Sequence, residues 1–156
     1  MAENIFVAIA REDGGVSIMT ILRADGNSPT AIAEEIEKWQ SSSDVAAVGH
    51  WPIKEADIPQ DLTFRDAWKA DGGIISVDME KARAIHMDRI RRVRNAELAK
   101  LDVPYMKAQE RGDQAAMTQI AAQKQALRDI PQTFDLNAAQ TPDELKALWP
   151  TILPKP

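Results

Sequence analysis

The sequence predicts an α+β protein: a small β-hairpin/helix/strand unit, then a long helical hairpin, then an extended proline-rich C-terminal arm. Three observations support this class. Two β-rich segments, residues 5–10 and 16–22, flank the turn-forming run Glu12-Asp13-Gly14-Gly15. Residues 78–131 form successive segments of helical character. Three of the nine prolines lie in residues 150–156, where they favour extended backbone.

The first predicted unit, residues 1–58, begins with a β-hairpin, because glycine tolerates the positive φ of a tight turn. Both of its strands are apolar on both faces, so the sheet needs cover on each side. Ser28 and Pro29 suit the N-cap and the first position of a helix with one apolar stripe. A third strand is expected at residues 45–53. The polar segment 56–61 then reads as a linker.

The second predicted unit, residues 62–131, is the helical hairpin. Asp78 is a suitable N-cap for a long helix that Pro104 breaks, and Gly112 is a suitable C-cap before the last segment. Apolar residues of that last segment recur at spacings of four and three, with one polar member: Ala116, Ile120, Gln123, Leu127 and Ile130. This seam predicts an antiparallel partner helix, and Pro131 is expected to end the segment.

The third predicted unit, residues 132–156, combines a short helix with the extended arm. Thr141 and Glu144 form a capping box with Pro142 at the first helical position. A helix of roughly seven residues is marginal by itself in water. The segment must therefore dock, either on its own hairpin or on another protein.

Charge is distributed unevenly along the chain. The net charge of −5 combines −7 over residues 1–61, +3 over residues 62–131 and −1 over residues 132–156. This asymmetry indicates a division into domains, or two solvated surfaces that attract each other.

Composition argues against catalysis. The chain has no cysteine and two histidines, and it has no glycine-rich phosphate loop. His50 lies at a strand end, and His86 shares a helix face with apolar residues, which predicts a buried, hydrogen-bonded side chain. The longest apolar run, residues 5–10, is far shorter than the roughly 20 residues of a membrane helix. We expect no enzymatic activity, no cofactor, no metal and no membrane partner.

Basic residues cluster in the long helix without forming one face. At 100° per residue, the four arginines Arg89, Arg91, Arg92 and Arg94 surround the helix. Nucleic-acid binding favours a single basic face, so we expect no nucleic-acid partner. The alternative role is ion pairing with Asp88, Glu97 or the acidic N-terminal unit.

The end of the chain resembles the C-terminal module of bacteriophage tail assembly chaperones and tail-fibre assembly proteins. The resemblance covers residues 85–156. It rests on an Arg-x-x-Arg-Asn motif at residues 91–95 of the long helix, a Leu-Arg-Asp-Ile-Pro segment at residues 127–131, and the terminal pair Trp149-Pro150. The chain departs from the family in having Leu101-Asp102-Val103 where Thr-Asp-Trp is usual, and in an insert at residues 137–148.

The resemblance implies a non-enzymatic assembly factor that binds a phage tail or tail-fibre protein in the host cytoplasm. The alternative is a minor structural component that stays in the virion tail, and either could use a second copy of the chain. Trp149 is expected to contribute more to such association than to the fold, although packing into its own core is the alternative. The residues expected to bind the partner are Arg91, Arg94, Asn95, Arg128, Asp129, Pro131, Trp149 and Pro150.

Overall fold

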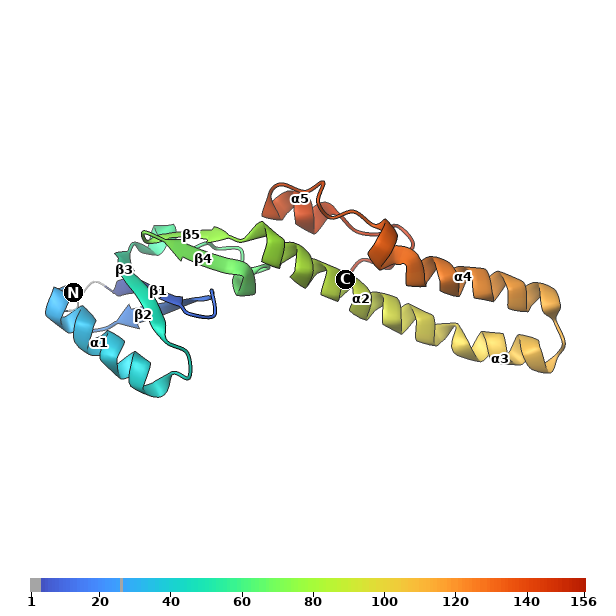
Figure 1. The fold of residues 1–156 in the computed structure, drawn as a ribbon, viewed down its shortest axis with the longest axis horizontal. Coiled ribbons are helices and arrows are strands. Elements are labelled where there is room, and N and C mark those ends of the chain that lie inside the picture. Colours follow the sequence, from blue (N-terminus) through green and yellow to red (C-terminus); the bar gives the residue numbers. More distant parts are fainter. Residues whose placement is uncertain (1–3, 26) are drawn as a thin grey trace. The chain divides into compact units, whose positions relative to one another are not determined.

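The computed structural model describes residues 4–25 and 27–156. It confirms the α+β class, with strands in the first part of the chain and long helices in the second (Figure 1). The chain divides into two compact units, Met1–Ala82 and Arg83–Pro156. Each unit is built around its own set of buried residues.

A three-stranded antiparallel sheet, in the order β2-β1-β3, forms the centre of the first unit. The predicted hairpin is confirmed: β1 (Ile5–Arg11) pairs with β2 (Val16–Ile21). Gly14, in the connecting turn, has φ 76°, which a residue without a Cβ adopts at no steric cost. The predicted third strand, β3 (Ala47–Ile53), pairs with the other side of β1.

One face of this sheet is covered by α1 (Pro29–Ser42). The helix begins as predicted, because the Ser28 hydroxyl accepts a hydrogen bond from the Ala31 N–H at 3.1 Å. Its apolar stripe packs on side chains from alternate positions of the strands. The buried cluster on this face comprises Val7, Ile9, Ile21 and Ile32.

The opposite face is covered by a second hairpin, β4 (Trp68–Asp71) and β5 (Ile74–Val77), which follows the short 3-10 helices η1 (Glu55–Asp57) and η2 (Arg65–Ala67). Its side chains form a second buried cluster with the sheet: Ala8, Val16, Trp68 and Ile75. The predicted domain boundary after residue 58 therefore differs from the structure. A sheet that is apolar on both faces needs this hairpin as cover.

Three consecutive helices form most of the second unit, the first of which begins at the end of the first unit. They are α2 (Met79–Lys100), α3 (Asp102–Glu110) and α4 (Gln114–Thr133). The Asp113 carboxylate caps α4 by accepting from the Ala116 N–H at 3.0 Å. α4 returns alongside α3, and Lys124 forms an ion pair with Asp102 at 2.6 Å (Figure 1).

Two details of α4 differ from prediction. The helix continues through Pro131 to Thr133, and the Phe134 N–H closes its last turn on the Ile130 carbonyl at 2.9 Å. Near a helix end, proline removes only one donor and the following residues can keep helical geometry. Gln123 is exposed and forms no buried polar layer, whereas Leu127 and Ile130 are buried.

Candidate functional site

The predicted extended arm is folded back onto α2 in the structure. The short helix α5 (Pro142–Ala147) forms with its predicted capping box, in which the Thr141 hydroxyl accepts from the Glu144 N–H at 3.2 Å. Apolar side chains after α4 are buried, including Leu136, Leu145 and Leu153. The marginal helix has thus docked on its own hairpin, because burial of these side chains supplies the stability that a single short helix lacks.

Two polar side chains of α2 hold the returning chain by its backbone. The Arg83 guanidinium donates to the Ala139 carbonyl at 2.8 Å, and His86 Nε2 lies 2.8 Å from the Leu148 carbonyl oxygen. Both residues lie on one face of α2, three positions apart. His86 is 4% exposed, so the prediction of a buried, hydrogen-bonded histidine is confirmed.

Trp149 contacts this same face. Its ring lies edge-on to the His86 ring, with centroids 5.7 Å apart, and its indole N–H donates to the Pro154 carbonyl at 3.1 Å. The neighbouring Pro150 is buried. Trp149 therefore links α2 to the chain terminus within one molecule, in contrast to the partner-directed arm expected from the sequence.

A cleft of about 290 Å³ lies where α2 ends, between α4 and the returning tail. Its surface is mostly apolar, and Ile152, at its edge, is 56% exposed. Lys100 and Glu97 form an ion pair of 2.6 Å at the wall. The lining residues are Glu97, Lys100, Leu101, Gln123, Ala126, Leu127 and Ile152. This geometry can accept an apolar side chain of a partner next to a charged rim.

The residues predicted to bind a partner are not gathered at this cleft. Arg91 is exposed and pairs with Asp88 at 2.9 Å, and Arg94 donates to the Asn95 side chain at 2.9 and 3.1 Å. Asp129 accepts from Gln125 at 2.7 Å. Arg128 is exposed, and Pro131 borders a different hollow of about 450 Å³ near the start of α2.

Sequence reasoning missed the lining residues of the cleft, although one signal was present. Gln123 is the one polar residue in the otherwise apolar row on α4. Such a position can mark where the packing between helices is interrupted and solvent reaches the helix face. Leu101 and Ile152 carry no comparable signal. They meet at one cleft only because the chain reverses after α4.

The described part of the chain, residues 4–25 and 27–156, contains no group of three or more His, Asp or Glu side chains placed to hold a metal ion. None of its helices combines the length and apolar character that crossing a bilayer requires. No protein-family model, no curated protein and no solved structure matches the chain.

Proposed function

We propose that this protein is a non-enzymatic assembly factor of bacteriophage tails or tail fibres, which binds a virion protein at the cleft of its helical unit. The observation that carries the proposal is the apolar cleft, with Ile152 exposed at its edge. The resemblance of residues 85–156 to phage assembly proteins supplies the class of partner. The protein would act in the host cytoplasm during assembly.

The cleft suits a projecting apolar side chain on a helix or loop of the virion protein. Such a side chain would contact Leu101 and Leu127 and cover the exposed part of Ile152. Fully burying one aliphatic side chain contributes about 1.5–3 kcal/mol, so this contact alone does not reach micromolar affinity, which needs about 8 kcal/mol. Contacts around the rim, where Glu97 and Lys100 lie, would supply the remainder and the orientation.

The docked tail gives this surface its shape. The bonds from Arg83 and His86 to the returning backbone, together with the Trp149 contacts, keep the tail against α2. A tail held in this way presents Ile152 without an ordering cost at the moment of binding. On this proposal Trp149 supports the binding surface and does not itself enter the partner.

The proposal is tested with purified tail and tail-fibre proteins encoded by the same phage genome, each measured separately against the full chain. Ile152→Asp places a charge at the cleft and is expected to weaken binding about tenfold or more, which corresponds to about 1.4 kcal/mol. Val103→Asp is the matched control, because Val103 on α3 is also 56% exposed and does not line the cleft.

Equal affinities for the two variants would contradict the assignment of the cleft, and absence of binding to every tail and fibre protein would contradict the function. Mass spectrometry of purified virions distinguishes the alternative. An assembly factor is absent from the finished particle, whereas a minor structural component of the tail is present.

A further inference from the structure

The helix α1 covers only part of its side of the three-stranded sheet. A helix with its side chains is about 10 Å wide and neighbouring strands lie about 4.8 Å apart, so one helix covers about two strands. The buried cluster under α1 agrees with this estimate, because Val7, Ile9 and Ile21 come from β1 and β2. From β3 the cluster gains only the partly buried Ala47. The rest of β3 therefore lies beyond the reach of α1.

Side chains of β3 on this face are exposed. Cross-strand partners point to the same face of a sheet, and His50 lies opposite Ile9. Pro52 likewise lies opposite Val7. Both His50 and Pro52 are exposed, although their two partners on β1 are fully buried. Val48, in the same strand, is 67% exposed.

A groove of about 510 Å³ lies between this part of β3 and the flank of α1. Its surface is mostly apolar. It is lined by Ile36, Glu37 and Gln40 of α1 and by residues 47–51 of β3. A groove between a helix and an uncovered strip of sheet has the shape that a second helix fills when it packs beside the first.

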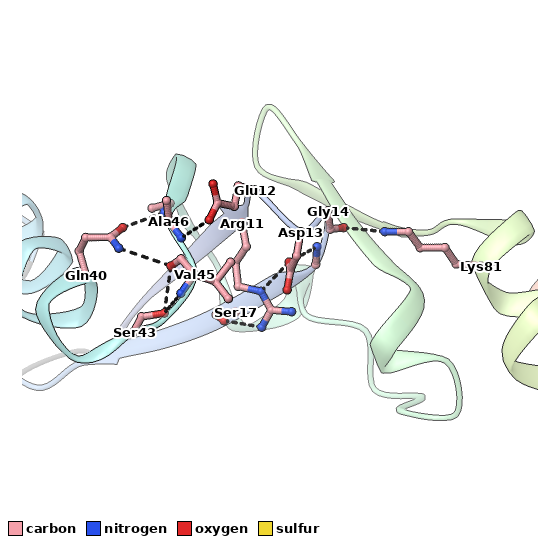
Figure 2. Close-up of polar contacts among 12 residues, drawn as sticks. Arg11, Glu12, Asp13, Gly14, Ser17, Gln40, Ser43, Val45, Ala46 and Lys81 are labelled. Carbon is pink, nitrogen blue, oxygen red and sulfur yellow. Dashed lines mark hydrogen bonds and ion pairs between the residues drawn. The ribbon is translucent and has the colours of Figure 1, made fainter.

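The outer edge of β3 is poorly suited to an added strand. Pro52 has no N–H to donate, and proline in an edge strand is placed with its nitrogen away from the paired neighbour. At the start of the strand, the Gln40 side chain accepts from the Ala47 N–H at 2.8 Å and donates to the Val45 carbonyl at 3.4 Å (Figure 2). A register irregularity in the pairing with β1 also disfavours a flat edge. A helix, which satisfies its own backbone groups, suits this surface better than an extended peptide.

The charges beside the groove favour a basic occupant. Two carboxylates of α1 are already paired, Glu34 with Arg23 at 2.6 Å. Glu35 pairs with Lys38, also at 2.6 Å. Glu37, at the wall of the groove, forms no ion pair with any of the described residues. The last turn of α1 carries no basic residue, so the negative end of the helix dipole has no cation beside it on this helix.

We propose that this groove binds a basic amphipathic helix of another protein, packed beside α1 and over β3. Its apolar stripe would cover Val48 and Pro52, and a lysine or arginine at its flank would pair with Glu37. The whole unit favours the same sign of partner, because residues 1–82 carry 7 Lys and Arg against 15 Asp and Glu, a net charge of −8. The cleft proposed above for the virion protein lies in the other unit, so the two proposals are independent.

Fluorescence anisotropy on the full chain tests the charge preference with two synthetic helical peptides of about 18 residues. Both carry leucines at helical spacing, flanked by lysine in one peptide and by glutamate in the other. The lysine peptide is expected to bind, and the glutamate peptide is not. Glu37→Lys is expected to raise the dissociation constant of the lysine peptide about fivefold or more. Asp71→Lys is the matched control, because it changes the net charge equally from the hairpin on the opposite face, and it is expected to change the dissociation constant less than about twofold.

Two further comparisons test the apolar contact and the helical form of the occupant. Val48→Ser is expected to weaken binding of the lysine peptide about fivefold. Leu22→Ser is its control, because Leu22 is 76% exposed and follows β2, at the other edge of the sheet. A lysine peptide with a central proline, which breaks the helix, is expected to lose binding.

Absence of binding, or equal affinity for the lysine and glutamate peptides, would overturn the proposal. So would equal losses from the two lysine variants, or from the two serine variants. Undiminished binding of the proline peptide would indicate an extended occupant instead. Sedimentation velocity addresses the remaining occupant, since a dimer of this chain that Val48→Ser dissociates would assign the groove to a second copy.

Discussion

Replacing Trp149 by alanine tests whether the C-terminal tail serves the fold or the partner. The side chain is half-buried, lies edge-on to His86, and donates its indole N–H to the Pro154 carbonyl. All of these contacts lie within one molecule. The substitution should therefore lower the free energy of unfolding of the helical unit, and it should affect a partner only through the altered shape of the tail.

The magnitude follows from how much of the tryptophan is buried. Removing a fully buried tryptophan costs about 3–5 kcal/mol, so a half-buried one should cost about 2 kcal/mol. Trp149→Phe keeps an aromatic ring beside His86 and loses the hydrogen bond to Pro154. It should cost about 1 kcal/mol, the net contribution of one such bond.

Urea unfolding monitored by circular dichroism measures both variants. Ile152→Ala is the control, because Ile152 is largely exposed and its truncation should change stability by less than about 0.5 kcal/mol. The reasoning would be refuted if Trp149→Ala left the unfolding free energy unchanged while binding of a virion protein fell by about 2 kcal/mol. That result would restore the partner-anchoring role expected from the sequence.

Two further predictions concern the first unit. Asp13 has a lowered pKa in the folded chain, so its charge stabilises the fold above the unfolded value of 3.8, and this contribution is lost as the pH falls through the lowered folded pKa. Asp13→Asn should reduce how steeply the free energy of unfolding falls as the pH is lowered, as measured by urea titrations at successive pH values. An unchanged slope would exclude this contribution. Cleavage after the exposed Lys54 should leave two fragments that elute together in native size-exclusion chromatography, because Trp68 and Ile75 pack on the sheet. Fragments that separate would instead support a boundary near residue 58.

Local features of the fold were predictable because adjacent residues encode them. The turn at Gly14, the N-caps Ser28 and Asp113 and the capping box at Thr141 each depend on dihedral preferences and hydrogen bonds within a few residues. The buried state of His86 was predictable for a related reason, since the apolar residues on its helix face are close in sequence.

The candidate site was not predictable in this way. The cleft needs Leu101, Gln123 and Ile152 to meet, and no local preference relates these three positions.

The sequence by itself determined the first hairpin, the starts of the helices that follow Ser28 and Thr141, and that the sheet required cover on both faces. Only the tertiary structure decided that the hairpin containing Trp68 supplies that cover, and that the tail packs on α2. The physical reason is that hydrophobic burial is not directional. Many distant segments could satisfy the same apolar face, and packing of the whole chain selects among them.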